Sequence, residues 1–228
     1  MRGLVVDIFY RELTMRIAVL FIGLVFSTAS LAQSPEQQRS TIAEDANFVA
    51  PLLNGQQVPE IDVTTSNGDS KSLASVLNNQ KTVLFFYRGG WCPFCNTQMG
   101  QLKKAESELK ALGFQLIGIS TDSPADLNKS IAKQALPYQL LSDYHSTIST
   151  AFGLSFFASE NVTKRYLNAM KLSNPLQKNA AGEERLVLPV PAIYVIDSKG
   201  LVQFNYVNPN FRVRLHEELL LKAAGLVK

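Results

Sequence analysis

Two kinds of hydrophobic pattern alternate along the chain and predict an α/β fold. Residues 82–87 (TVLFFY) and 114–119 (FQLIGI) are mostly apolar and rich in β-forming side chains, which is typical of strands covered on both faces. Between these strands, apolar residues recur at the spacing of an amphipathic helix: Met99, Leu102, Ala105, Leu109 and Leu112. Gly113 follows and is expected to end that helix.

The remaining pattern predicts a mixed sheet flanked by helices. Further strands are expected at residues 61–63, 138–141 (as an edge strand), 192–196 and 201–206. Further helices are expected at residues 72–77, 124–134, 146–152, 161–171 and 212–224. Apart from its one helix, the polar stretch 154–186 is interpreted as an insertion before the last hairpin. This order of elements favours a single domain whose sheet is covered by helices.

The N-terminal segment has the pattern of a signal peptide. Residues 17–26 (IAVLFIGLVF) are all apolar, Arg16 precedes them, and small residues lie before a cleavage point expected after Ala32. The run can be extended to only 15 residues, fewer than the roughly 20 that span a bilayer, so an uncleaved anchor is the weaker alternative. Met15 is a candidate start, because the first 14 residues fit a signal peptide poorly.

We therefore expect a signal peptide at residues 1–32, an N-terminal lead-in with a short helix at 33–57, and one domain at 58–228. The protein is expected to be exported to the periplasm, with no stable membrane anchor after cleavage. The formal charge of the whole chain is +3. Residues 1–32 contain three arginines and two acidic residues, so the chain after cleavage carries +2. So weak a charge does not favour nucleic acid as a partner.

Candidate chemistry is concentrated in the segment YRGGWCPFC, which contains the only two cysteines, Cys92 and Cys95. The cysteines lie where a buried strand meets the start of a long helix, so Cys92 can attack a disulfide and Cys95 can resolve the mixed disulfide. With a peroxide as oxidant, either sulfur can form the sulfenic acid and the other can condense with it. We expect Cys92 to be exposed and Cys95 to be more buried. An unperturbed thiol is only about 3% ionised at pH 7, and the helix dipole lowers its pKa by less than one unit.

The residues around the pair are candidates for supporting roles. Arg88 is a candidate stabiliser of a thiolate, with a solvated loop arginine as the alternative. Trp91, the only tryptophan, is expected to pack beside the pair, either as a shield or as ordinary core filling. Gly89 and Gly90 allow the chain to turn from the strand into the helix. Phe94 is assigned no role.

Two other interpretations of the cysteines are weaker. A structural disulfide across so short a loop removes little entropy from the unfolded chain, so it stabilises a fold poorly. A zinc site needs about four ligands, and the chain offers only His145 and His216 besides the two cysteines. Both histidines are expected at the surface or at a helix cap, so neither a metal nor another cofactor is expected.

Four segments in order resemble one family within the thioredoxin-fold superfamily: FFYRGGWCPFC, GISTDSPADL, LPYQLLSDYHSTISTAFGL and LPVPAIYVIDSKGLVQFNYV. They are similar to peroxiredoxin-like members of the alkyl hydroperoxide reductase and thiol-specific antioxidant family. The resemblance covers roughly residues 58–207. It implies a thioredoxin fold, an antioxidant oxidoreductase with a redox-active CxxC, and a thiol electron donor that is either thioredoxin-like or a membrane reductant.

The resemblance implies two different roles for the cysteines. The family's peroxidatic cysteine falls on Cys95, whereas its proline falls on Arg88, its threonine on Cys92 and its later arginine on Pro191. Compared with thioredoxins, Cys92 is instead the attacking cysteine and Pro191 matches the cis-proline that faces the dithiol, with Pro189 as its rival. The missing peroxide-binding residues favour a protein disulfide as substrate, and the matching segments favour a hydroperoxide.

The sequence thus predicts an enzyme that cycles Cys92 and Cys95 between dithiol and disulfide to reduce hydroperoxides or protein disulfides. The alternative from a different class is a thioredoxin-fold binding module that holds an exported partner without catalysis. That module would keep its partner when both cysteines are replaced, whereas the enzyme would lose turnover without Cys92.

Overall fold

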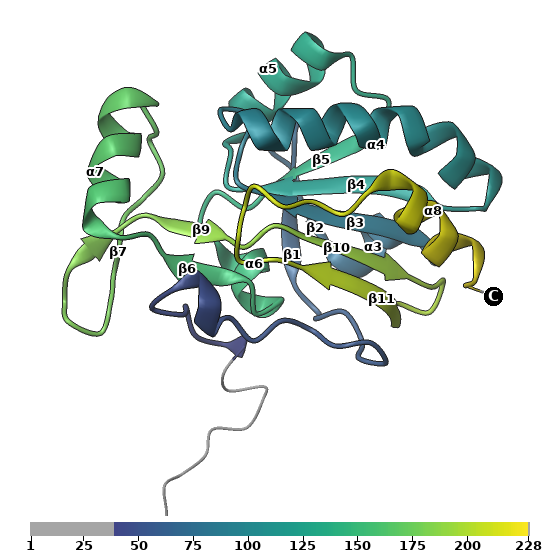
Figure 1. Cartoon of the computed structure of the whole chain (residues 1–228), viewed down its shortest axis with the longest axis horizontal. Helices are drawn as coiled ribbons and strands as arrows, with labels where there is room; N and C mark the ends of the chain where they lie inside the picture. Colours follow the sequence, from purple (N-terminus) through teal and green to yellow (C-terminus); the bar gives the residue numbers. More distant parts are fainter. Residues whose placement is uncertain (1–38, 228) are drawn as a thin grey trace, which may run out of the picture. The chain divides into compact units, whose positions relative to one another are not determined.

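The computed structural model describes residues 39–227, so the predicted signal peptide lies outside the described residues. Seven strands form the main sheet in the order β11-β10-β3-β4-β5-β1-β2 (Figure 1). At its centre, β3 (Thr82–Tyr87) is parallel to β4 (Gln115–Ser120) and antiparallel to β10 (Ala192–Ile196). The predicted mixed sheet is therefore confirmed.

The other elements of the sheet and its cover follow the predicted order. The remaining strands of the sheet are β1 (Asp62–Thr65), β2 (Ser70–Ser72), β5 (Gln139–Ser142) and β11 (Val202–Val207). The helices are α3 (Leu73–Leu77), α4 (Pro93–Ala111), α5 (Pro124–Gln134), α6 (Thr147–Ala151), α7 (Glu160–Ala169) and α8 (Glu217–Gly225). The lead-in contains the 3-10 turn η1 (Ala46–Phe48), and among the described residues no helix combines the length and hydrophobicity needed to cross a bilayer.

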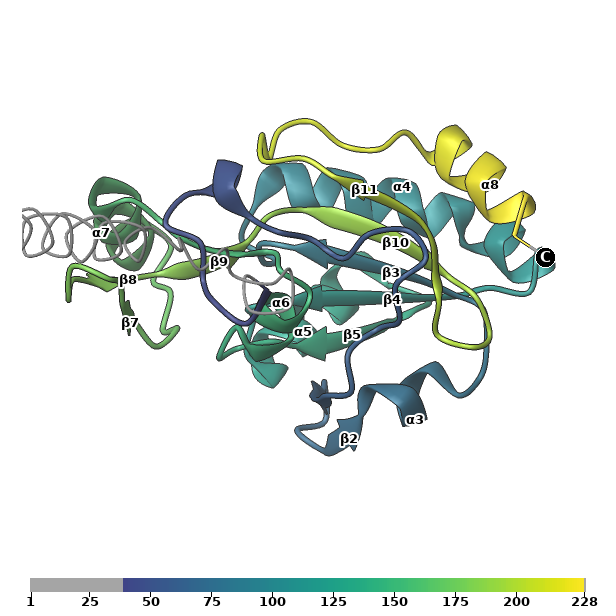
Figure 2. The same ribbon diagram turned by 90° about the horizontal axis from the view of Figure 1, so that it is seen from below.

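Both faces of the sheet are covered by helices, which explains why β3 is apolar throughout. Every residue of β3 is buried. Val83, Phe85 and Tyr87 pack in the core beneath α4, α5 and α8, whereas Leu84 and Phe86 pack on the opposite face with α3 and α6. Figures 1 and 2 show α4 and α8 together on one side of the sheet. The cysteines belong to the core on the α4 side.

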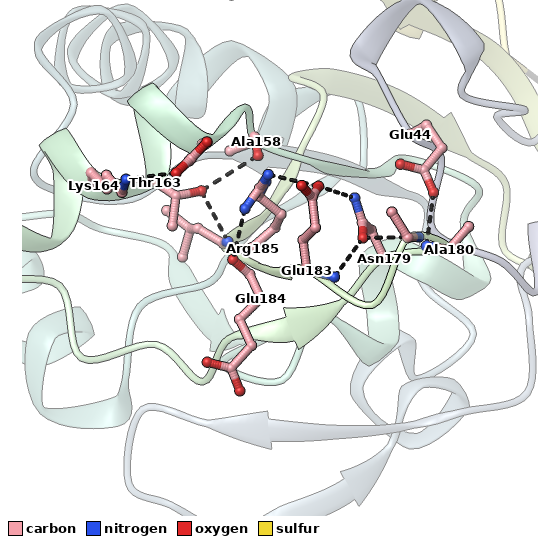
Figure 3. A network of polar contacts seen from close by, with 12 residues as sticks. Glu44, Ala158, Thr163, Lys164, Asn179, Ala180, Glu183, Glu184 and Arg185 are labelled. Carbon is pink, nitrogen blue, oxygen red and sulfur yellow. Dashed lines mark hydrogen bonds and ion pairs between the residues drawn. The ribbon is translucent and has the colours of Figure 1, made fainter.

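The predicted insertion is a separate layer beside the sheet. At its base, β6 (Ser155–Phe157) pairs with β9 (Val187–Pro189), which leads directly into β10. Beyond this pair lie α7 and a hairpin of β7 (Gln177–Lys178) and β8 (Glu184–Arg185), seen at the left of Figure 1. Exposed polar contacts hold the hairpin, as Figure 3 shows for Asn179, Glu183 and Arg185.

Two predictions about the elements were wrong. The segment at 138–141 is not an edge strand, because β5 pairs with β4 on one side and with β1 on the other. The last helix begins at Glu217 rather than Arg212, because His216 is its N-cap and two acidic residues form its first turn. Residues 208–216 form a loop, and this loop reaches the cysteines.

Candidate active site

The cysteines are presented by a short loop that turns from β3 into α4. Cys92 is the N-cap of α4, and its N–H donates to the Gly89 carbonyl at 3.1 Å. Gly89 has φ of +147°, and a Cβ at this position would lie 2.2 Å from Trp91 Nε1. A Cβ on Gly90 would lie 2.1 Å from the Ser130 hydroxyl. Close packing on both sides, as well as backbone conformation, therefore requires the two glycines.

Asp122 anchors this loop from the end of β4, a role that the sequence analysis missed. Its carboxylate accepts the Gly90 N–H at 2.7 Å and the Ser120 hydroxyl at 3.1 Å. Burial raises the pKa of Asp122 to about 6. A cavity of about 270 Å³ lies beside Asp122, Gly90 and Trp91, and neither cysteine lines it. An acidic residue just after a buried strand was the only local signal for this anchor.

Cys92 has the properties of a reactive thiolate. Its pKa is lowered to about 6, mainly because the Cys95 thiol donates a hydrogen bond to its sulfur. Burial opposes this effect, and the Cys95 N–H and the positive charges of Arg88 and Arg214 add to it. The Cys92 side chain makes no N-cap hydrogen bond that meets normal geometry. At pH 7 most Cys92 is therefore ionised.

Cys95 has the opposite properties. Its side chain is completely buried, and burial is the main reason that its pKa is raised well above the usual value. The hydrogen bond to Cys92 and the negative charge of that sulfur raise the pKa further. Both cysteines are free thiols, and Cys92 is only 2% exposed, so the prediction that Cys92 is exposed was wrong. Chemical asymmetry, rather than exposure, distinguishes the two sulfurs.

Arg88 is a buried cation beside Cys92. Only 4% of the residue is exposed, and its Nη2 donates to the Tyr166 hydroxyl at 2.6 Å. Its guanidinium lies over three rings, with centroids at 4.2 Å for Phe211, 5.1 Å for Tyr166 and 5.2 Å for Trp91. The alternative of a solvated loop arginine is therefore wrong.

The insertion reaches the dithiol loop through aromatic contacts. Trp91 is half-buried, and its ring centroid lies 4.9 Å from that of Tyr166 on α7. Trp91 packs both against the core that holds the cysteines and against a small core formed by Ala158, Tyr166, Leu186 and Leu188. It therefore fills the junction between the two cores. The sequence did not identify Tyr166, because its hydrogen-bond partner Arg88 lies 78 positions away.

Other candidates lie outside this arrangement. Pro191 is buried directly before β10, and residues 39–227 contain no cis peptide bond, so neither Pro191 nor Pro189 is a cis-proline in this structure. His216 is exposed and caps α8, and His145 is also exposed, as expected. Within the described part of the chain, no group of residues is suited to hold a metal ion. Phe94 is 41% exposed, and its ring packs edge-on against that of Phe211, with the ring centroids 5.6 Å apart.

A family profile and several known proteins match this chain. The profile of the AhpC/TSA family matches residues 54–205. A putative peroxiredoxin bcp of Haemophilus influenzae is 34% identical over 104 residues, which span 46% of this chain and 66% of that protein, just under two thirds. The chloroplastic peroxiredoxin Q of Sedum lineare is 27% identical over 91% of this chain and 95% of its own.

Solved structures show the same fold at lower identity. The peroxidoxin BcpB structure from Mycobacterium tuberculosis superposes with a TM-score of 0.58 at 20% identity, covering 77% of this chain and 97% of its own. At this level of identity the likeness establishes the thioredoxin fold of the peroxiredoxins and nothing finer. The family profile, in contrast, covers more than half of the chain and includes the dithiol loop. The chain therefore belongs to the AhpC/TSA family.

Proposed function

We propose that the protein is a thiol peroxidase with an antioxidant role, in which Cys92 reacts with a hydroperoxide and Cys95 closes a disulfide with it. One observation carries the proposal: the lowered pKa of Cys92 beside a protonated Cys95, in a loop that lies within the part of the chain matched by the family. Relatives named peroxiredoxins support the peroxide substrate.

The reaction has two balanced steps on the dithiol. The Cys92 thiolate attacks the terminal oxygen of the hydroperoxide, so an S–O bond forms, the O–O bond breaks, and the alkoxide takes a proton from solvent. Sulfur is oxidised by two electrons to a sulfenic acid. Cys95 then loses its proton and attacks the Cys92 sulfur, so an S–S bond forms, the S–O bond breaks, and the departing hydroxide takes up a proton and leaves as water. A protein dithiol, the electron donor, restores the pair by exchange.

The choice of Cys92 as the attacking residue differs from the family correspondence, which favours Cys95. Attack requires a thiolate, and Cys95 is the protonated partner while Cys92 is ionised. Arg88 lies where the family has a proline, and its positive charge lowers the Cys92 pKa. We therefore assign the first step to Cys92 and the second to Cys95.

Exchange with a protein disulfide is the second candidate for the same dithiol. It is favoured by Cys92 as N-cap of α4, with Cys95 one turn later to release a mixed disulfide. The family's threonine and later arginine are replaced here by Cys92 and Pro191. A binding module without catalysis has less support, because nothing about such a module explains two sulfurs of opposite ionisation.

Two single variants separate the candidate reactions. Reduced Cys92→Ser and Cys95→Ser are mixed with one equivalent of hydrogen peroxide, and peroxide loss and dimedone-trapped sulfenic acid are measured. We expect Cys92→Ser to lose peroxide reduction by at least about 100-fold, whereas Cys95→Ser consumes peroxide once and accumulates the adduct on Cys92. Trapping on Cys95 would reverse the roles, and a Cys92 mixed disulfide with no peroxide loss would favour exchange.

The cellular setting is part of the same proposal. We infer that an exported protein with this dithiol is reduced by a thioredoxin-like protein or a membrane reductant, because each turnover leaves a disulfide. The apolar residues 17–26 support export to the periplasm. Expression in a bacterium and N-terminal sequencing of the periplasmic fraction test it: a mature chain that begins at Gln33 is expected, and a cytoplasmic chain that retains these residues would contradict it.

A further inference from the structure

A second arginine, Arg214, contacts Cys95, the cysteine that we assign to the second step. Arg214 Nη2 donates to the Cys95 sulfur at 3.4 Å, a distance suited to a hydrogen bond with sulfur. Arg214 lies in the loop at residues 208–216, beyond the part of the chain that the family profile matches. Its position beside the dithiol is therefore a feature of this chain that the family profile does not describe.

The loop is built to hold Arg214 in this position. After β11, the side chains of Asn208 and Asn210 accept backbone N–H groups two residues further on, at 3.0 and 3.2 Å, and turn the chain back. Figure 2 shows this segment running back past α4 to α8. Leu215, the residue after Arg214, is buried in the same core as the cysteines. The turns on one side and the buried leucine on the other fix the arginine.

The guanidinium is oriented by a second contact on α4. Arg214 Nη1 donates to Gln98 Oε1 at 3.2 Å, and Gln98 lies three residues after Cys95, on the same side of the helix. Gln98 is itself buried, so this contact is sheltered from water. The Nε of Arg214 is buried and has no hydrogen-bond partner within the described residues. Gln98 is therefore a positioning residue: it holds Nη1 while Nη2 contacts the Cys95 sulfur.

Oxidation of Cys92 changes what surrounds Cys95. In the reduced pair, the Cys95 pKa is raised by burial, by its hydrogen bond to Cys92 and by the negative charge of Cys92. A sulfenic acid at Cys92 is neutral, so the charge effect disappears with the first step. The influences that lower the Cys95 pKa remain: the charge of Arg214, which is the larger, and the Arg88 backbone N–H. A hydrogen bond from Arg to a thiolate is also stronger than one to a thiol.

We propose that Arg214 activates Cys95 for the second step, by holding its sulfur as a thiolate once Cys92 has been oxidised. The inference rests on the proposed assignment of Cys92 to the first step and Cys95 to the second. The charges of both arginines lower the Cys92 pKa, but only the Arg214 side chain donates a hydrogen bond to the Cys95 sulfur. The same activation applies to any oxidised Cys92, whether a sulfenic acid or a mixed disulfide.

The test compares Arg214→Gln with Arg212→Gln, an exposed arginine two residues away in the same loop. Reduced proteins are mixed with hydrogen peroxide, and the fluorescence of Trp91, the only tryptophan, follows both steps. We expect Arg214→Gln to slow disulfide formation about threefold for each unit by which the Cys95 pKa rises, since lost thiolate outweighs gained nucleophilicity. Dimedone-trapped Cys92 sulfenic acid and its overoxidation to sulfinic acid should increase in parallel.

Arg214→Lys and the pH profile separate activation from a structural role. The lysine variant keeps the positive charge, so it should recover part of the rate, and the inflection of the second step should lie at higher pH in Arg214→Gln than in Arg212→Gln. Equal second-step rates and pH profiles in the two glutamine variants would overturn the proposal. A larger effect on the peroxide-consuming step than on disulfide formation would also overturn it.

A second arm does not depend on peroxide. A small aromatic disulfide forms a mixed disulfide with Cys92 and releases one coloured thiolate, and attack by Cys95 then releases another. Arg214→Gln should slow the second release more than the first, because the charge of Arg214 also lowers the Cys92 pKa but its hydrogen bond is to Cys95. If peroxide is not consumed but this slowing is seen, the peroxidase assignment fails while the role of Arg214 stands; if both releases are unchanged, the role of Arg214 fails.

Discussion

The dithiol loop and the tip of the insertion are held in opposite ways. Residues 88–95 include three nearly inaccessible side chains, Arg88, Cys92 and Cys95. Arg88 packs against aromatic rings, and the Gly90 N–H donates to the buried Asp122 carboxylate. The β7–β8 hairpin is held by polar contacts at the surface, such as Arg185 Nη2 to Glu183 Oε2 at 2.7 Å (Figure 3). The insertion therefore affects the dithiol through its buried base and α7, not through its tip.

The largest loss of stability should come from a substitution at the buried base of the insertion. Leu186 is fully buried in the small core that includes Tyr166, and Trp91 packs against it. We expect Leu186→Ala to lower the free energy of unfolding by about 2–5 kcal/mol, because it removes buried methyl groups and leaves a cavity. Chemical denaturation measures this, with Met170→Ala, 42% exposed in the same insertion, as the matched control. Equal losses in the two variants would contradict the account.

The next effect should come from the hydroxyl that joins α7 to the dithiol loop. Tyr166→Phe removes the acceptor for Arg88 Nη2 and leaves a buried charged donor unpaired. The expected loss of unfolding free energy is about 1.5–3 kcal/mol, with slower alkylation of Cys92 because Arg88 is less firmly held. Tyr144→Phe is the control, because its hydroxyl donates to Ser173 rather than to a residue of the dithiol loop. Unchanged stability and alkylation in Tyr166→Phe would show that α7 does not support the site.

A smaller effect is expected on the ionisation of the Cys92 thiol. Alkylation of Cys92 should rise with pH through about 6 and then level, because the thiolate fraction grows until the thiol is fully ionised. Cys95→Ala removes the donor to the Cys92 sulfur, so the inflection should move to higher pH by at least about one unit, or 1.4 kcal/mol. Cys95→Ser retains a hydroxyl donor and should move it less. The same inflection in the alanine variant and the wild type would refute the role of that hydrogen bond.

The smallest effect should come from the tip of the hairpin. Asn179→Ala removes contacts to Glu183, and these contacts are exposed. We expect a loss of no more than about 1 kcal/mol in unfolding free energy and no change in Cys92 alkylation. A thiol reactivity that changed with this variant would mean that the tip is coupled to the dithiol after all.

Local signals predicted most of the fold. The strand expected at 82–87 and the helix expected at 124–134 have the same bounds as β3 and α5 in the structure. The position of β5 was wrong because pairing on both sides depends on β1, a strand far away in sequence. The start of α8 was wrong because residues 212–216 were counted as helix, although His216 and the two acidic residues after it indicated the true start.

The candidate site was predictable only where its chemistry is contiguous. Cys92, Cys95, Arg88 and Trp91 lie within eight residues of one another along the loop, and the motif identified all four. Asp122, Tyr166 and Arg214 come from three other segments and meet the loop only in the folded chain. Spacing along the sequence does not predict such contacts, so the ionisation states of the two sulfurs could be inferred only from the structure.

The central claim is that Cys92, and not Cys95, is the thiolate of the reduced protein at neutral pH. The most direct measurement is alkylation of the reduced wild type with iodoacetamide at a series of pH values, with the label at each cysteine quantified by mass spectrometry. The account predicts labelling of Cys92 with an inflection at about pH 6 and no labelling of Cys95 over the same range. Labelling of Cys95 first, or of neither cysteine below about pH 8.5, the ordinary thiol value, would contradict it.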